Sequence, residues 1–205
     1  MDNITKDSIR KEILEKRNAL TIEEIRGKSD LIFQKLISMD IYKNARDILI
    51  YASMGSEVCT DEIISDALSV GKNVFCPKCT DTQNGIMEFI KITDISQLVK
   101  GYFGIHEPVI DEESVIYGIE KAGCNDIQSD EDEMRDSKVL MIMPLVAYDA
   151  DNNRIGYKGG YYDRYLEKHP NMVTCALAFS IQKSKKLIPA EAHDIKPQEI
   201  ITEEN

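Results

Sequence analysis

The segment from Arg154 to Asp163 combines residue types that can do chemistry on phosphate groups. It contains three glycines, two cations, three tyrosines and a carboxylate, in the order Arg-Ile-Gly-Tyr-Lys-Gly-Gly-Tyr-Tyr-Asp. Glycine has no Cβ, so a loop built from it lets backbone N–H groups approach phosphate oxygens closely. Arg154 and Lys158 add positive charge, and Asp163 suits a Mg²⁺ ion that bridges phosphates. Because the tyrosine faces also suit a ring-shaped substrate, the segment indicates nucleotide chemistry on an aromatic or heterocyclic partner.

The same segment also has a purely structural interpretation. Glycine pairs often form turns, and Tyr-Tyr-Asp at a helix start supplies packing and a carboxylate that the helix dipole favours. Neither of the standard phosphate-loop patterns, GxxxxGK[ST] and GxGxxG, is present in the segment. The residue types alone therefore leave a phosphate loop and a structural turn equally open.

The composition is typical of a globular enzyme from a reducing compartment. The chain has 205 residues, of which 42% are hydrophobic and 30% charged, and this length predicts one domain spanning residues 1–205. A formal net charge of −11 argues against a nucleic-acid partner. A polar N-terminus and the absence of a membrane-spanning apolar run predict a cytoplasmic protein with no membrane partner. The pair Cys76 and Cys79 has no second pair to complete a zinc site, and the cysteines are expected to be free thiols.

Hydrophobic periodicity predicts alternating helices and buried strands. Predicted helices cover residues 5–19, 21–37, 60–68 and 161–168. Predicted strands cover residues 48–52, 74–76, 87–92, 139–143, 173–179 and 200–202. Most of these strands are continuous apolar runs, whereas 87–92 alternates and is expected to be antiparallel or at an edge. The pattern predicts a doubly wound α/β fold with a mostly parallel sheet flanked by helices, and the acidic residues 118–137 predict a surface insertion.

Ligands of such a fold bind beyond the carboxyl ends of the strands. Four segments follow predicted strand ends, and their convergence would place Glu57, Lys78, the tyrosine-rich loop and Gln182 around one cleft. Glu57 has a second interpretation, since it also precedes Thr60, the expected cap of the third helix, and a carboxylate there serves a helix N-terminus.

Three cations line one stripe of the first predicted helix. Lys6, Arg10 and Arg17 are separated by four and seven residues, a spacing that places them on one side of a helix. A solvated basic face is the ordinary explanation of such a stripe, and phosphate binding is the functional one.

Nearly end to end, the sequence resembles the 5-formyltetrahydrofolate cyclo-ligase family. The matching features are the basic first helix, Tyr51-Ala52-Ser53 with Glu57 and Thr60, Gly104 to Pro108, Pro144 to Asp149, the loop from Arg154 to Asp163, Phe179 with Gln182, and Asp194 before Ile200 to Glu203. The resemblance implies a Rossmann-like, NagB/RpiA/CoA-transferase-like fold. It also implies that 5-formyltetrahydrofolate is converted to 5,10-methenyltetrahydrofolate with ATP and Mg²⁺, releasing ADP and phosphate. In that reaction ATP phosphorylates the formyl oxygen, and folate N10 then attacks the formyl carbon.

The resemblance further implies roles for individual residues. ATP would be held by Lys6, Arg10, Arg154, Ile155, Gly156, Tyr157, Lys158, Gly159, Gly160, Tyr161 and Tyr162. Folate would contact Ala52, Glu57, Tyr157, Lys158, Gly159, Gly160 and Tyr161. Asp163 and Asp194 would ligate Mg²⁺, directly or through water, while Arg154, Lys158 and Tyr161 would act in catalysis. The expected partners are small-molecule substrates only, and the expected state is a monomer.

Three features depart from the usual family pattern. Lys158 stands where the loop usually has glycine, and a side chain at a left-handed backbone position would strain the loop. Leu145 replaces the glycine usual after Pro144, and the acidic insertion is longer than expected. Two other functions stay open: a paralogue with the same ATP loop that acts on another metabolite, and a non-catalytic folate- or nucleotide-binding module.

Overall fold

A six-stranded sheet forms the centre of the protein, in the order β10-β9-β6-β1-β2-β3. The computed structural model describes residues 5–101, 104–118 and 138–204. The sheet comprises β1 (Asp47–Ile50), β2 (Asn73–Asp81), β3 (Ile86–Ile92), β6 (Val139–Pro144), β9 (Val173–Leu177) and β10 (Glu199–Ile201). All neighbours pair in parallel except β3, which runs antiparallel to β2 at the edge of the sheet. The predicted α/β fold with a mostly parallel sheet is confirmed, and so is the antiparallel edge strand.

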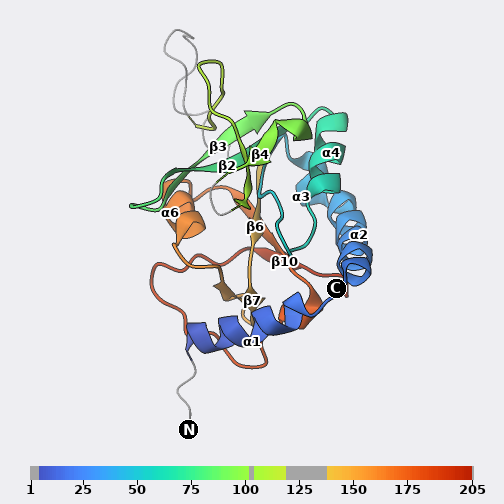
Figure 1. Cartoon of the computed structure of the whole chain (residues 1–205), viewed down its shortest axis with the longest axis vertical. Coiled ribbons are helices and arrows are strands. Elements are labelled where there is room, and N and C mark those ends of the chain that lie inside the picture. The colour runs from blue at the N-terminus through green and yellow to red at the C-terminus, as the bar shows by residue number, and fades with distance from the viewer. Residues whose placement is uncertain (1–4, 102–103, 119–137, 205) are drawn as a thin grey trace.

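Helices cover both faces of this sheet (Figure 1). Successive strand residues point to opposite faces, so Ile48 and Ile50 pack into one core cluster and Leu49 into another. The first cluster includes residues of α2 (Ile22–Ser38), α3 (Asp40–Asn44) and α4 (Asp61–Ser69), whereas the second includes residues of α6 (Tyr161–Lys168). Leu145 is buried in the second cluster, so the residue that replaces the usual glycine adds apolar packing there.

The first two helices begin within one residue of their predicted starts. Thr5 caps α1 (Lys6–Asn18) and Thr21 caps α2, and both form capping boxes with the residue three positions later, Ser8 and Glu24. Such boxes satisfy backbone N–H groups that the first helical turn leaves without partners. The helix boundaries were therefore readable from the sequence.

Thr60 behaves differently from a helix cap, contrary to the sequence prediction. It precedes α4, but its side chain makes no capping hydrogen bond to the helix. Thr60 Oγ1 instead donates to the carbonyl oxygen of Tyr51 at 2.9 Å and accepts from the backbone N–H of Ser53 at 3.0 Å. These contacts fix the chain between β1 and α4, which carries Glu57.

Helix α1 lies across the carboxyl end of β6 (Figure 1). Ile9 and Ile13 pack against Val146, Ile155 and Ile188 in a third core cluster. Burying one such side chain contributes about 1.5–3 kcal/mol, so these contacts hold the helix in place. The basic stripe of α1 is thereby brought to the sheet edge at which ligands of α/β folds bind.

Strand β2 extends beyond its predicted end at Pro77. It continues to Asp81, because past Phe75 it pairs with β3 only, and a proline is tolerated where one edge of a strand needs no N–H donor. Two short hairpins were not predicted: β4 (Leu98–Lys100) with β5 (His106–Pro108), and β7 (Ala147–Tyr148) with β8 (Arg154–Ile155). Short 3₁₀ turns, η1 (Ile95–Gln97) and η3 (Ser180–Gln182), complete the described elements. Elements of two or three residues are too short to show a hydrophobic period.

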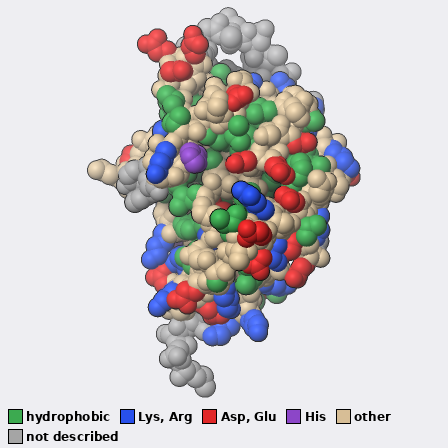
Figure 2. Space-filling view, turned by 45° about the vertical axis from the view of Figure 1, so that its right-hand side comes forward, with side chains coloured by type: hydrophobic (Ala, Val, Ile, Leu, Met, Phe, Trp, Pro, Cys, Tyr) green, Lys and Arg blue, Asp and Glu red, His purple; other side chains and the backbone are tan. Residues whose placement is uncertain are grey.

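Charged side chains of both signs are mixed over the face drawn in Figure 2. Among the described residues, no helix is both long and apolar enough to cross a membrane. The predicted acidic insertion falls almost entirely on residues 119–137, which lie outside the described residues.

A buried carboxylate organises the loop between β7 and β8. Asp149 Oδ1 accepts from the backbone N–H groups of Asp151 and Asn153, both at 2.9 Å. Its Oδ2 accepts from Asn153 Nδ2 at 2.8 Å and from the backbone N–H of Ile188 at 2.7 Å. Burial alone would raise the pKa of Asp149, but these hydrogen bonds outweigh it and hold the pKa below 3.8.

Replacing Asp149 should therefore destabilise the fold. We expect Asp149→Ala to lower the free energy of unfolding by roughly 3 kcal/mol in chemical denaturation, because buried N–H groups lose a charged acceptor. Because the folded pKa is depressed, the difference from wild type should be fully present above pH 4 and shrink as pH falls through that pKa. Asp151→Ala, at an exposed position of the same loop, is the control. Equal stability of the two variants would contradict the assignment.

Candidate active site

The cations of α1 contact the glycine loop directly. Arg10 Nε donates to the carbonyl oxygen of Gly156 at 2.9 Å. Lys158 Nζ lies 3.2 Å from the carboxylate of Asp7, which also pairs with Arg10. Asp7 and Lys158 are both exposed, and exposed ion pairs contribute little to stability, so a phosphate can replace the carboxylate at low cost. The structure thus brings together the two segments predicted to hold ATP.

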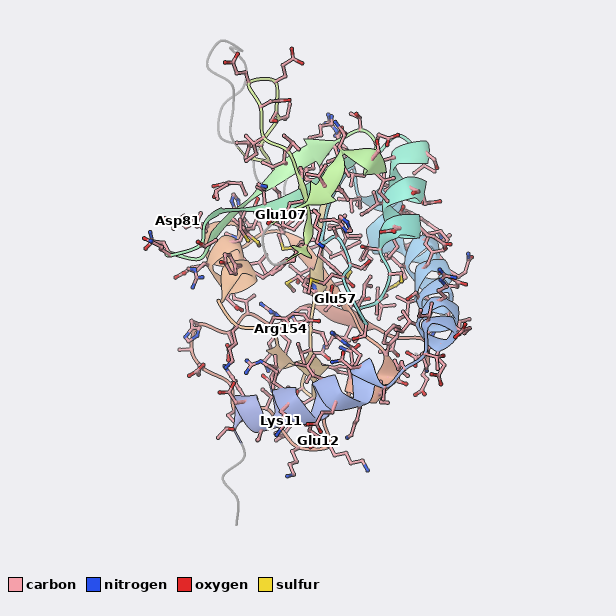
Figure 3. The ribbon with its side chains drawn as sticks, viewed as in Figure 1. Lys11, Glu12, Glu57, Asp81, Glu107 and Arg154 are labelled. Carbon is pink, nitrogen blue, oxygen red and sulfur yellow. The ribbon has the colours of Figure 1, made fainter. Side chains whose placement is uncertain are left out.

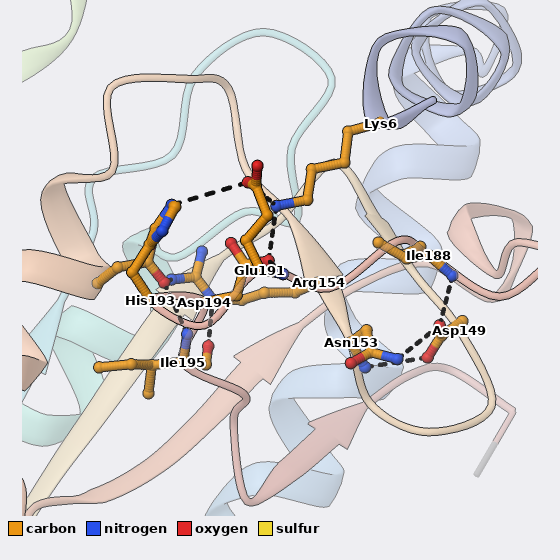
Figure 4. A network of polar contacts seen from close by, with 10 residues as sticks. Lys6, Asp149, Asn153, Arg154, Ile188, Glu191, His193, Asp194 and Ile195 are labelled. Carbon is orange, nitrogen blue, oxygen red and sulfur yellow. Dashed lines mark hydrogen bonds and ion pairs between the residues drawn. The ribbon is translucent and has the colours of Figure 1, made fainter. Parts of the chain in front are cut away.

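Arg154 lies beside Ile195 (Figure 4) and forms an ion pair with Asp163 at the base of this loop. Arg154 Nη2 lies 2.7 Å from Asp163 Oδ1, and Arg154 Nε donates to the carbonyl oxygen of Ile195 at 3.1 Å. The backbone N–H of Ile195 donates to the same Asp163 oxygen at 3.0 Å. Arg154 is 9% exposed, so its guanidinium has little freedom to turn.

Asp194 directly precedes Ile195 in the chain. Lys6 Nζ lies 2.6 Å from Asp194 Oδ2 and 2.7 Å from Glu191 Oε2, as Figure 4 shows. Ligand atoms of Glu191, His193 and Asp194 all lie within 4.8 Å of one another. Burial opposes ionisation of Asp194, but the Lys6 ammonium and the Glu191 N–H outweigh it and lower its pKa, so the carboxylate is charged at neutral pH.

The predicted metal ligands Asp163 and Asp194 are therefore neighbours through Ile195. Carboxylate oxygens are the protein ligands that Mg²⁺ prefers. The Asp194 carboxylate already holds one cation, the ammonium group of Lys6. The donor chemistry of this corner of the molecule fits a magnesium ion. Sequence reasoning missed Glu191 and His193, which belong to no motif that was considered.

Three consecutive residues of the loop have left-handed backbone conformations. The φ angles are +103° for Lys158, +94° for Gly159 and +61° for Gly160. The predicted left-handed position of the lysine is confirmed, and such a conformation costs a non-glycine residue about 1–2 kcal/mol. A Cβ on Gly159 would lie 2.7 Å from Cε2 of Tyr161, so a side chain there would displace the Tyr161 ring as well as strain the backbone.

Arg164 is a loop anchor that sequence reasoning did not identify. Its Nε and Nη2 donate to the carbonyl oxygen of Gly85, at 3.1 and 3.0 Å, and Nη2 also contacts the carbonyl oxygen of Gly159. The guanidinium carbon lies 5.7 Å from the centre of the Tyr161 ring. Its partners are backbone carbonyls, which any residue provides, so no sequence signal marks them.

Glu57 lies in the segment after β1, and its carboxylate faces the Tyr157 hydroxyl of the glycine loop. It is 8% exposed, and its Oε2 accepts from the backbone N–H of Met54 at 2.8 Å. Burial raises the pKa of Glu57, and the Met54 N–H, the Arg17 charge and the Tyr157 hydroxyl only partly oppose it. Burial, followed by the charge of Glu57, also raises the pKa of Tyr157 to about 12. Ala52, the other predicted folate contact outside the loop, is buried just after β1.

A second acid, Glu107 of β5, holds Lys78 beside the site. Lys78 Nζ lies 3.0 Å from Glu107 Oε2, and the Cys79 N–H donates to Glu107 Oε1 at 3.3 Å. Figure 3 shows Glu57, Glu107 and Arg154 in the middle of the molecule, whereas Lys11 and Glu12 lie on α1 at its lower edge. Lys78 therefore belongs to the same region, as predicted, but its charge is already matched by a buried carboxylate.

Three of the predicted side chains point into the protein instead. Ile155 belongs to the apolar cluster under α1, and the Tyr162 ring packs edge-on against Phe89 with ring centres 6.3 Å apart. Gln182 Nε2 donates to the carbonyl oxygens of Leu145 and Val146 at 2.9 and 3.0 Å. The prediction that Gln182 lines the cleft is wrong, because backbone groups occupy its buried amide.

Two surface hollows are present, and the second of them touches Ile195. One, of about 220 Å³, is bordered by α3 and the start of β6, and the other, of about 240 Å³, lies beside α6 and Ile195. Neither hollow includes the cations of α1 or the glycine loop. The candidate site is therefore defined by its convergent side chains.

Comparison with known proteins identifies the family. The model of the 5-formyltetrahydrofolate cyclo-ligase family matches residues 2–203. The chain belongs to this family. The mouse 5-formyltetrahydrofolate cyclo-ligase is 32% identical over 99% of this chain and 96% of its own length. The Haemophilus influenzae enzyme of the same name is 25% identical over 95% of this chain and 96% of its own length.

Solved structures agree with this assignment. The 5,10-methenyltetrahydrofolate synthetase of Aquifex aeolicus superimposes with a TM-score of 0.76 at 28% identity, covering 98% of this chain and 91% of that one. The Mycoplasma pneumoniae 5,10-methenyltetrahydrofolate synthetase superimposes with a TM-score of 0.69 at 25% identity, and 99% of both chains is covered. The predicted family and enzyme class are confirmed: the protein is a ligase of folate metabolism with ATP as cosubstrate.

The left-handed lysine gives a stability prediction. We expect Lys158→Gly to raise the free energy of unfolding by about 1 kcal/mol, because glycine removes the backbone strain and the lost ion pair is exposed. Lys158→Ala is the matched control, since it removes the ion pair but keeps the strain, and it should give no gain. A loss of stability in Lys158→Gly, measured by urea denaturation, would show that the loop conformation is not strained.

Proposed function

We propose that this enzyme closes the methenyl ring of 5-formyltetrahydrofolate through a phosphorylated intermediate. The formyl oxygen attacks the γ-phosphorus of ATP, the bond to ADP breaks, and an iminium phosphate forms. Folate N10 then attacks the formyl carbon and gives up its proton to solvent, and the carbon–oxygen bond breaks to release inorganic phosphate. Phosphoryl transfer of this kind depends on positioning and charge neutralisation, which agrees with a site of cations and a glycine loop.

ATP is proposed to bind between α1 and the loop that begins at Arg154. Arg10 and Lys158 both pair with the carboxylate of Asp7, and Arg10 also bonds the loop at Gly156. Both cations would therefore reach the same phosphate chain. The left-handed run ends at Gly160, the N-cap residue of α6, and backbone N–H groups at a helix start of this kind bind anions. Ile155 and Tyr162 would support this loop through packing, with their backbone facing the nucleotide.

Asp163 and Asp194 are proposed to hold Mg²⁺. When bound, the ion would neutralise phosphate charge and orient the γ-phosphoryl group. Lys6 pairs with Asp194 in the structure, so it stands beside the nucleotide phosphates and shares their neutralisation. Arg154 keeps Asp163 in place through the 2.7 Å contact between Nη2 and Oδ1. Its guanidinium also adds a positive charge beside the proposed metal site.

The folate ring is proposed to lie between Glu57 and the tyrosines of the loop. A carboxylate accepts two parallel N–H donors, which is the pattern that the pterin edge offers. Tyr157 and Tyr161 supply flat faces, and Ala52 leaves room beside them. Tyr161, Arg154 and Lys158 would surround the formyl oxygen while the negatively charged phosphoryl group transfers to it.

One domain of a single chain is proposed to be sufficient. All the proposed contacts come from residues of this chain arranged around one sheet edge, which supports a monomer. Small-molecule substrates and an acidic net charge of −11 agree with a cytoplasmic enzyme that binds no nucleic acid.

Asp163→Asn tests the metal role. Wild-type protein should couple ADP release to the absorbance rise of methenyltetrahydrofolate in the presence of Mg²⁺. In Asp163→Asn we expect kcat to fall at least about 100-fold and the Mg²⁺ requirement to weaken, because a carboxylate ligand is lost. Glu167→Gln, an exposed acid on the same helix, is the control. Unchanged activity and Mg²⁺ dependence in Asp163→Asn would refute the assignment.

Glu57→Gln tests the folate role through pH. The raised pKa means that Glu57 takes up a proton above its ordinary value of 4.5 as the pH falls. The wild-type kcat/KM for 5-formyltetrahydrofolate should therefore drop on the acid side with a midpoint above 4.5. In Glu57→Gln we expect a KM for folate at least about tenfold higher and no such acid limb. An acid limb that persists in the variant would assign it to another group.

A further inference from the structure

Arg17 is the buried cation of α1. It shares a stripe with Lys6 and Arg10 but is only 3% exposed. Its Nε donates to the hydroxyl of Ser56 at 3.0 Å, and its Nη2 donates to the hydroxyl of Tyr157. Its Nη1 is buried and has no hydrogen-bond partner among the described residues.

Stability does not account for this arginine. A buried charged group is costly even when paired, and a buried N–H without an acceptor adds about 1–3 kcal/mol to that cost. An unbranched apolar side chain would fill the same space without either cost. The placement of Arg17 therefore calls for a role in the site that it contacts.

The contacts of Arg17 join the two walls of the folate half of the site. Ser56 precedes Glu57 in the segment after β1, and Tyr157 belongs to the glycine loop. The guanidinium carbon also lies 5.4 Å from the centre of the Tyr157 ring, so the cation stacks on the ring as well as bonding its hydroxyl. The planar guanidinium of Arg17 bonds both Ser56 and Tyr157, so it fixes the distance between the segment after β1 and the glycine loop. The flexible ammonium group of a lysine could not fix that distance.

We propose that Arg17 is a positioning residue for folate binding, which holds Tyr157 and the Ser56–Glu57 segment in register so that both meet the pterin together. The inference rests on the proposed folate roles of Glu57 and Tyr157. It adds a role in folate binding to the basic stripe of α1, whose other members, Lys6 and Arg10, are proposed to bind ATP.

The charge of Arg17 has a second effect on the same wall. Burial raises the pKa of Glu57, and the groups that face this carboxylate are Arg17 from α1, Tyr51 after β1, Tyr157 from the glycine loop and Tyr162 from α6. Arg17 is the cation in this set, so it favours the ionised carboxylate. Removing it should raise the pKa of Glu57 further.

Two substitutions of Arg17 separate its geometry from its charge. For Arg17→Met we expect the KM for 5-formyltetrahydrofolate to rise about tenfold, while the KM for ATP changes less than about twofold. The acid limb of kcat/KM for folate should also move to higher pH. Arg17→Lys keeps the positive charge but loses the planar guanidinium. The acid limb of its kcat/KM for folate should therefore stay near that of wild type, while its KM for folate should still rise. Lys16→Met, at the exposed neighbouring position of α1, is the control.

A stability measurement distinguishes positioning from a structural role. We expect Arg17→Met to keep its thermal midpoint near that of wild type, because the buried charge and the unmade hydrogen bond are removed together. A midpoint that falls while both KM values stay unchanged would show a merely structural arginine and overturn the proposal.

A double-mutant cycle with Tyr157→Phe identifies the path of the effect. If Arg17 acts through the Tyr157 hydroxyl, the Arg17→Met/Tyr157→Phe protein should lose no more folate affinity than the worse single variant. Fully additive losses would overturn this path. Normal folate kinetics in both Glu57→Gln and Tyr157→Phe would refute the proposed folate site itself, whereas defects there with normal kinetics in Arg17→Met would refute only the role of Arg17.

Discussion

The contact between Arg10 and the carbonyl oxygen of Gly156 is the interaction on which the site depends. The protein carries a net charge of −11, so it can bind polyphosphate only by gathering its cations at one place. Helix α1 does this, because its apolar side packs against Val146 and Ile155 while its basic side meets the glycine loop. The cations there are matched by carboxylates from α1 itself and from the segment around Asp194. At the proposed ATP site, a bound phosphate chain would therefore take the place of these carboxylates as the partner of the cations.

The glycine loop is held in its unusual conformation by groups on three elements. Arg10 of α1, Arg164 of α6 and the Gly85 carbonyl between β2 and β3 all contact it or one another. The interior below it is equally constrained, since Arg154 and Asp163 are tied to the backbone of Ile195. Such a loop needs little reorganisation when it meets a phosphate chain, and pre-organisation of this kind is the main protein contribution to phosphoryl transfer.

Much of this fold was predictable from the sequence, because helix caps such as Thr21 with Glu24 and continuous apolar strands such as residues 139–143 are local signals. The same holds for the glycine loop and the basic stripe. What the sequence could not show were contacts in which one partner is a backbone atom, such as Arg164 with Gly85 and Gln182 with Leu145. The burial of Arg17 was equally hidden, because the spacing of a stripe does not reveal which member is covered by a loop 140 residues later in the chain.

The position of α1 has a consequence for how the protein is made. In the core cluster that contains Ile9 and Ile13, the described residues from outside α1 all lie between positions 146 and 188, far along the chain. During synthesis α1 leaves the ribosome long before those partners exist, and it stays undocked while the central strands assemble. Docking of this helix is thus a late, long-range closure step in folding. The contacts between α1 and the glycine loop therefore form only after most of the sheet has been synthesised.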